Sequence, residues 1–102
     1  MSAIKVNKAN FEEIKNSEKV VLLDFYADWC GPCRMVGPVI EEIAGERADI
    51  VVGKVNVDEE DELAGQFGVY SIPTLVVMKG GKIVSQESGA KPKAQILAML
   101  EK

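Results

Sequence analysis

The sequence of 102 residues contains no histidine, and this absence excludes more chemistry than any other feature of its composition. Without an imidazole, the chain cannot form a Ser-His-Asp triad, a Cys-His nucleophile pair or a zinc or copper site with histidine ligands. Its two cysteines are also too few for a structural metal site with four ligands from one chain. Proton transfer near neutral pH must therefore depend on a carboxylate, a thiol or a lysine whose pKa is displaced from its ordinary value.

Long apolar segments and an excess of positive charge are missing as well. The longest apolar runs are far too short to cross a bilayer, and twelve Lys and Arg against sixteen Asp and Glu give a net charge of −4. This charge disfavours a nucleic-acid backbone or an anionic membrane as the main partner. Residues 1–8 lack the apolar stretch and the cleavage site of a secretory signal, which favours a cytoplasmic location. The remaining composition, 47% hydrophobic and 27% charged, predicts one globular domain over residues 1–102.

The chain alternates between strand-like and helix-like patterns in the order βαβαβαββα. Because strands that alternate with helices pair in parallel and a closing hairpin pairs antiparallel, this order predicts an α/β fold with a mixed sheet and helices on both faces. Reactive groups in such sheets gather beyond the carboxyl ends of the central strands. The predicted strands cover residues 3–7, 20–27, 50–57, 75–78 and 82–86. Of the predicted helices, the first follows Asn10, the second follows the cysteine motif, the third covers residues 58–67 and the last begins near Pro92.

Three of these helices carry more detailed expectations. Asn10 is predicted to cap the first helix, with acidic residues near its positive end. In the second helix, Met35 is predicted to lie on the apolar stripe, and Pro38 is predicted to kink the helix because it removes an amide donor. The five acids at positions 58–62 are predicted to occupy the first turns of the short third helix as a solvated face.

Cys30 and Cys33 lie three positions apart, where the most apolar strand gives way to a helix. At this spacing both thiols share one helical face and can form a disulfide, and Gly31-Pro32 suits the tight turn and the start of the helix. Unpaired amides and the positive end of the helix dipole favour a thiolate on Cys30, which makes Cys30 the predicted nucleophile. Cys33 is expected to be more buried, protonated and slower to react.

A structural disulfide and a pair of metal ligands are the alternatives for these cysteines. A disulfide that closes so short a loop stabilises little, and the chain has no second cysteine pair to complete a metal site. Reversible redox chemistry is therefore the favoured interpretation.

Asp24 interrupts the apolar run of residues 20–27. A buried carboxylate without a partner costs several kcal/mol, so its pKa is expected to be raised. Asp24 is then a candidate acceptor for the proton of Cys33, directly or through a water, and Lys54 on the next strand is its expected cationic partner. Two simpler interpretations stay open: Asp24 ends the strand and satisfies loop amides, and Lys54 is an ordinary surface lysine.

Trp29 and Pro73 are two further candidates. Pro73 follows Ile72 and precedes a strand, where a proline must take the first position or an edge. Trp29 is the only tryptophan and directly precedes the predicted nucleophile. It belongs either to the core or to an exposed surface that meets a partner.

Together these residues make the sequence resemble the thioredoxin family over nearly its whole length. The family's order and spacing are matched by Trp29-Cys30-Gly31-Pro32-Cys33, Asp24-Phe25, Pro38, Lys54, Ile72-Pro73-Thr74 and Gly89. The resemblance implies the thioredoxin fold, with a five-stranded sheet flanked by four helices and a cis bond between Ile72 and Pro73.

The resemblance also implies roles for individual residues. The implied catalytic residues are Cys30, Cys33, Asp24, Lys54 and Pro73, with a buried Asp24 that helps to activate Cys33. The implied substrate groove consists of Trp29, Gly31, Pro32, Ile72, Pro73, Gly89 and Ala90. In this groove the backbone of Ile72 would pair with an extended peptide.

The implied activity is that of a general protein disulfide reductase. It would work through a reversible Cys30–Cys33 disulfide, keep cytosolic protein thiols reduced and donate electrons to reductive enzymes. Oxidising relatives often carry His between the cysteines, whereas Gly31-Pro32 resembles the reducing branch. We expect a monomer without cofactor or metal, and because the chain has no flavin or nicotinamide fingerprint, a thioredoxin reductase is the expected electron donor.

Tyr26, Ser88 and Pro92 depart from the commonest pattern of the family, which usually has Trp at the first position and an apolar residue at the second. The first two differences bear on partner preference. Two other functions stay open at this point: a binding or chaperone-subunit role that uses the groove without turnover, and a dimer bridged by a metal or an iron–sulfur cluster.

Overall fold

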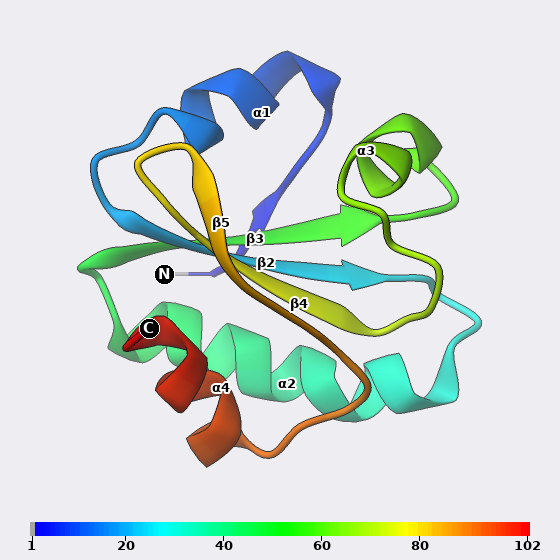
Figure 1. Ribbon diagram of the computed structural model, residues 1–102. Helices are drawn as coiled ribbons and strands as arrows, with labels where there is room; N and C mark the ends of the chain where they lie inside the picture. The colour runs from blue at the N-terminus through cyan, green and yellow to red at the C-terminus, as the bar shows by residue number, and fades with distance from the viewer. Residues whose placement is uncertain (1) are drawn as a thin grey trace.

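The computed structural model describes residues 2–102, which form five strands and four helices in the predicted order (Figure 1). Their bounds are β1 (Ile4–Lys5), α1 (Lys8–Lys15), β2 (Val20–Tyr26), α2 (Gly31–Glu46), β3 (Ile50–Asn56), α3 (Asp61–Gln66), β4 (Thr74–Lys79), β5 (Lys82–Ser88) and α4 (Lys93–Leu100). Within this described part of the chain, no helix has the length and apolar character needed to cross a membrane.

The five strands form one mixed sheet in the order β1-β3-β2-β4-β5. Strands β1 and β2 run parallel to β3, whereas β4 runs antiparallel to both β2 and β5. The turn between β4 and β5 contains Gly80 and Gly81 with φ angles of 60° and 78°. A two-residue hairpin turn of this hand requires positive φ, which glycine adopts without strain. The predicted mixed sheet and its closing hairpin are therefore confirmed.

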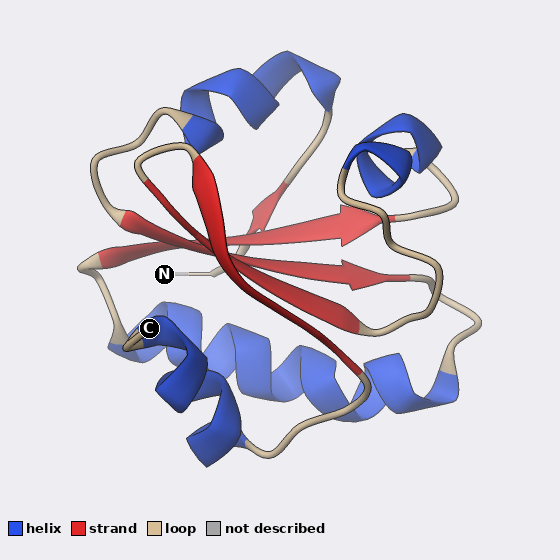
Figure 2. Ribbon diagram, viewed as in Figure 1, coloured by secondary structure: helices blue, strands red, loops and turns tan. Residues whose placement is uncertain are grey.

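Helices cover both faces of the sheet, and each face has its own apolar core (Figure 2). On one face α2 and α4 pack against β2, with Ile40 and Ile96 in the same cluster as Leu22. On the other face α1 and α3 pack through Phe11 and Leu63 against Leu23. Because successive side chains of a strand point to opposite faces, β2 must be apolar at consecutive positions, and its sequence is so except at Asp24.

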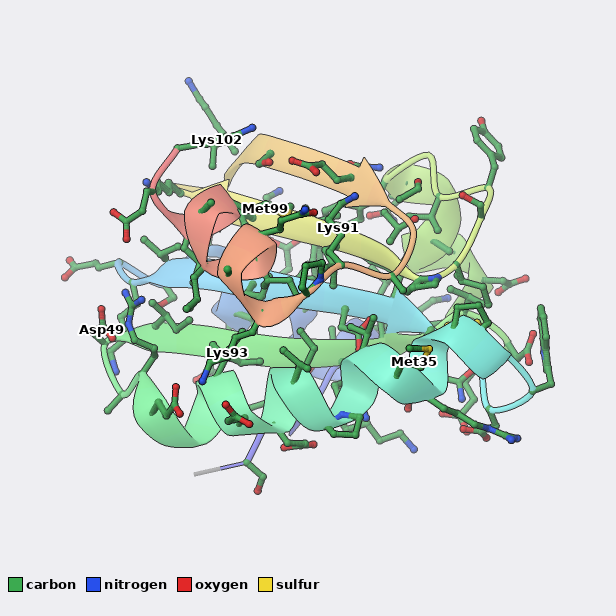
Figure 3. All side chains as sticks on the ribbon, turned by 90° about the horizontal axis from the view of Figure 1, so that it is seen from below. Met35, Asp49, Lys91, Lys93, Met99 and Lys102 are labelled. Atoms are coloured by element: carbon green, nitrogen blue, oxygen red, sulfur yellow. A yellow bond between two sulfur atoms is a disulfide. The ribbon has the colours of Figure 1, made fainter. Side chains whose placement is uncertain are left out.

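Helix α4 is joined to α2 by charge as well as by apolar packing. The Lys93 ammonium at the start of α4 points toward α2 and pairs there with Glu42 and Glu46 (Figure 3). These carboxylates raise the pKa of Lys93 above its ordinary value. The pairs are partly exposed to solvent, so each contributes little to stability.

The first helix begins earlier than predicted, and Asn10 is not its cap. Asn7 caps α1, since its side chain accepts a hydrogen bond from the Asn10 N–H at 3.0 Å. Asn10 returns the contact, because its side-chain oxygen accepts the Asn7 N–H at 2.8 Å. The two asparagines form a reciprocal capping box, which shortens the preceding strand from the predicted 3–7 to Ile4–Lys5.

Two expectations about the other helices are wrong. Helix α3 begins at Asp61, so the acids at positions 58–60 precede it instead of occupying its first turns. Met35 is 73% exposed and does not belong to the apolar stripe of α2. Pro38 lies inside helix α2, which continues past it to Glu46, and the kink expected at this residue stays a prediction.

Gly53 permits the close approach of β1 and β2 to β3. A Cβ atom at this position would lie 2.6 Å from Val6 Cγ2 and 3.0 Å from Leu23 Cδ2, both in the packed core. Gly53→Ala should therefore lower the free energy of unfolding by about 1–3 kcal/mol, measured by chemical denaturation. Gly65→Ala is the matched control, because its Cβ meets nothing within 4 Å. Equal stability of the Gly53→Ala variant and the parent would contradict this packing.

Candidate active site

The two cysteines lie just beyond the carboxyl end of the central strand β2. Cys30 is the N-cap residue of α2, and its sulfur accepts the Cys33 N–H at 3.2 Å. Proline occupies the first turn of this helix, where its missing amide hydrogen is not needed. The free amides and the dipole of a 16-residue helix are thus directed at the Cys30 sulfur.

Cys30 and Cys33 form a disulfide, with their Cα atoms 5.3 Å apart. The two residues are equally buried, at 4% and 5% exposure, so the expectation that Cys33 is more buried is wrong for this oxidised form. The reason lies in the loop before β4, which covers the first cysteine. The Cys30 sulfur is 3.8 Å from the Ile72 carbonyl oxygen, and both cysteines share a small apolar cluster with Ala27.

Asp24 lies inside β2 and is only 1% exposed. Neither of its carboxylate oxygens has a hydrogen-bond partner among residues 2–102, so the interpretation that it satisfies loop amides is wrong. Burial raises the pKa of Asp24 from 3.8 to about 6, and the charge of Lys54 partly opposes this rise. The side chain can therefore exchange a proton close to neutral pH.

Lys54 lies on β3 directly opposite Asp24 in the register of the two parallel strands. Its ammonium nitrogen is 4.7 Å from the centre of the Tyr26 ring. Lys54, Tyr26 and Cys33 line one open pocket of about 430 Å³ together with residues of α2. Lys54 is thus half-buried beside the site and is not an ordinary surface lysine.

The loop before β4 supplies the other wall of the site. The peptide bond between Ile72 and Pro73 is cis, as the family resemblance implies. The Pro73 carbonyl accepts the Gly89 N–H at 2.8 Å, which brings residues after β5 beside this loop. Gly89 has a φ of 96°, in the region that favours glycine, and both Gly89 and Ala90 are exposed.

Trp29 lies on the surface next to the disulfide and not in the core. Its side chain is 69% exposed, and its indole N–H donates a hydrogen bond to the Asp58 carboxylate at 2.8 Å. Gly31 and Pro32, which follow the first cysteine, are also exposed. An apolar, accessible surface therefore surrounds a buried disulfide.

Sequence patterns did not reveal the contributions of Asp58 and Tyr26 to this site. Asp58 belongs to a run of acids in which nothing distinguishes it, and its contact with Trp29 spans 29 positions. The position of Tyr26 could have been inferred from the sequence. It follows Asp24 by two positions on one strand, so its side chain points to the same face of the sheet as that of Asp24. In residues 2–102 no group of three or more cysteine or acidic side chains is arranged to hold a metal ion.

Comparisons with known proteins agree on one family. The family model described as Thioredoxin matches residues 2–102. The chain is 54% identical over 94 residues to Thioredoxin 2 of Chlorobaculum tepidum, covering 90% of this chain and 86% of that one. It is 49% identical over 100 residues to a thioredoxin of Alicyclobacillus acidocaldarius, covering 97% and 95%. A solved mutant thioredoxin from Halobacterium salinarum superposes with a TM-score of 0.90 at 38% identity, covering 98% of this chain and 88% of that one.

The raised pKa of Asp24 makes stability depend on pH in a defined direction. Because the folded protein holds this proton more tightly than the unfolded chain, the contribution of the protonated side chain is complete below pH 4 and is lost as the pH rises through about 6. Asp24→Asn removes this ionisation. From a rise of 3.8 to about 6, the oxidised variant should be more stable than the parent by about 3 kcal/mol at pH 8 and nearly equal to it at pH 4.

Chemical denaturation of both oxidised proteins at pH 4, 6 and 8 measures this difference. Comparing the two proteins at each pH cancels the titration of all other groups. A difference that stays constant from pH 4 to pH 8 would show that the pKa of Asp24 is not raised.

Proposed function

The chain belongs to the thioredoxin family and is a thiol–disulfide oxidoreductase that reduces protein disulfides, and from this premise we propose how its residues divide the work. Its redox group is the Cys30–Cys33 disulfide, and it needs no cofactor. The single observation that carries the proposal is the position of this disulfide, at the first turn of the long helix that follows β2, the strand whose buried Asp24 carboxyl has no hydrogen-bond partner among residues 2–102.

In the dithiol form, Cys30 is the attacking residue. The helix N-terminus and the Cys33 N–H stabilise a negative charge on its sulfur, which favours the thiolate. This thiolate attacks one sulfur of a substrate disulfide. A mixed disulfide between Cys30 and the substrate forms, and the other substrate sulfur leaves as a thiolate.

Cys33 completes the reaction. Asp24 accepts the proton of the Cys33 thiol, and the resulting thiolate attacks the Cys30 sulfur, which releases the second substrate thiolate and leaves Cys30 bonded to Cys33. A carboxyl with a pKa of about 6 is suited to this step, because it is mostly ionised at neutral pH yet binds a proton more readily than an exposed carboxylate does. The positive charge of Lys54 favours the ionised form of Asp24 and so limits the rise in its pKa that burial causes.

The substrate groove surrounds the disulfide. We place Trp29, Gly31, Pro32, Ile72, Pro73, Gly89 and Ala90 in it. An extended segment of the substrate would lie along the backbone of Ile72, whose carbonyl is already next to the Cys30 sulfur. The absence of side-chain bulk at Gly89 leaves that edge of the groove open.

A chain that reduces disulfides must itself be reduced again. Reducing the Cys30–Cys33 disulfide takes two electrons from outside, and a thioredoxin reductase is the donor that we propose. We further propose that residues 1–102 act as one monomeric domain in the cytoplasm. There it would keep protein thiols reduced and supply electrons to reductive enzymes.

Removing Cys33 should stop the reaction halfway. Cys33→Ser leaves the attacking thiolate but removes the group that resolves the mixed disulfide. When the reduced variant is mixed with a disulfide-containing protein, a covalent complex through Cys30 should accumulate, visible by non-reducing electrophoresis and reversed by dithiothreitol. The matched control is Cys30→Ser, which should neither form the complex nor turn over. A complex that forms equally well with Cys30→Ser would contradict the assignment of Cys30 as the attacking residue.

The groove assignment predicts an effect on protein substrates alone. Gly89→Val strains the backbone at a φ of 96° and fills the open edge of the groove. KM for a protein disulfide should rise about tenfold, which is about 1.4 kcal/mol of lost binding, whereas turnover of a small aromatic disulfide stays nearly unchanged.

Gly80→Val is the matched control for this substitution. Gly80 has a φ of 60° and lies at the opposite end of β4, so the variant carries similar backbone strain away from the disulfide. It should leave KM unchanged. If both variants raise KM equally, or if Gly89→Val affects both substrates equally, Gly89 does not border the groove.

A further inference from the structure

The Tyr26 ring lies against the lysine next to the buried carboxyl. The Lys54 ammonium is 4.7 Å from the ring centre, within the range of a cation–π contact. Tyr26 follows Asp24 by two positions on β2, so both side chains lie on the same face of the sheet. Lys54 is paired with Asp24 in the register of β2 and β3. One lysine is therefore flanked by an aromatic ring and a carboxyl.

The ring is the contact that holds the lysine in place. Within residues 2–102, the Lys54 ammonium forms neither a hydrogen bond nor an ion pair, and the Asp24 oxygens have no hydrogen-bond partner. A lysine side chain has four rotatable methylene groups, and the pocket of about 430 Å³ beside it is open to solvent. Without the ring, the ammonium would be free to move into water, where it is better hydrated.

The neighbouring charged groups are held by other contacts. The other charged or titratable residues around this pocket are Asp28, Cys33, Arg34 and Glu41, and Lys5 on β1 is close enough to interact electrostatically with Tyr26 and Asp28. Arg34 donates to the Asp28 carbonyl at 3.0 Å, and Glu41 accepts the Ala3 N–H at 2.8 Å. Lys5 pairs with Glu59 at 3.2 Å. None of these groups therefore replaces Lys54 beside the carboxyl.

We propose that Tyr26 is a positioning residue, whose ring holds the Lys54 ammonium next to Asp24 and thereby sets the pH at which Asp24 accepts the Cys33 proton. The second half of this statement rests on the proposed function, whereas the first half does not. The physical link is electrostatic: an ammonium fixed beside a buried carboxyl favours its ionised form, and an ammonium that moves into water is screened.

Carbon-13 NMR titration of the Asp24 carboxyl in the oxidised protein tests the positioning directly, because it requires no turnover. In the parent the midpoint should lie near the pKa of about 6. Tyr26→Phe retains the ring and should keep that midpoint. Tyr26→Leu removes the ring and should raise the midpoint by about 0.5 pH unit or more. If the leucine variant loses its near-ultraviolet circular dichroism, Tyr26→Met offers a second side chain without a ring.

A double-mutant cycle shows whether the effect passes through the lysine. In a Lys54→Met background, Tyr26→Leu should produce no further shift. A shift of the same size in that background would mean that the ring acts through packing or desolvation and would overturn the proposal. Equal midpoints in the parent and in Tyr26→Leu, or a downward shift, would overturn it as well.

The pH dependence of the resolving step separates this proposal from the proposed function. In Tyr26→Leu, the pH profile for release of substrate by Cys33 should move upward together with the NMR midpoint. A shifted midpoint with an unshifted profile would support the contact between ring and lysine but overturn the role of Asp24 as the proton acceptor.

Discussion

The burial of β2 on both faces is the constraint on which the rest of the structure depends. Helices α2 and α4 pack on one side of it and α1 and α3 on the other, so the side chains of residues 21–25 are all buried. Such burial removes water from the strand and leaves no room for a polar side chain to move out. A carboxyl placed in this strand is therefore buried with it. Asp24 is buried in this way, and its carboxylate has no hydrogen-bond partner in the described chain.

The same strand determines where chemistry occurs. Its carboxyl end delivers the chain directly to the first turn of α2, so that Cys30 meets unpaired amides as it leaves the sheet. In the mechanism that we propose, the stability lost by ionising a buried Asp24 and the reactivity gained at Cys33 have one origin, the low polarity around β2. In the same proposal, Lys54 on the neighbouring strand and Tyr26 at the end of β2 set the pH at which Asp24 is ionised.

The sequence was informative wherever a local pattern has one physical meaning. The apolar run of β2, the spacing of Cys30 and Cys33 and the isolated Asp24 all predicted features that the structure contains. It was less informative where the outcome depends on contacts between distant segments. The cover that Ile72 places over Cys30 comes from 42 positions away, and for this reason the relative burial of the two cysteines was predicted wrongly. The cap of α1 was misassigned because two asparagines three positions apart both satisfy the preference for a cap.

The equilibrium reduction potential of the Cys30–Cys33 pair tests the central claim most directly. It can be titrated in thiol–disulfide buffers and followed by the fluorescence of Trp29, the only tryptophan of the chain. A protein disulfide reductase driven by a dedicated donor should have a potential more negative than that of the cytosolic glutathione pool, about −240 mV. A potential well above that value would contradict the account, because the disulfide would then oxidise protein thiols in place of reducing protein disulfides.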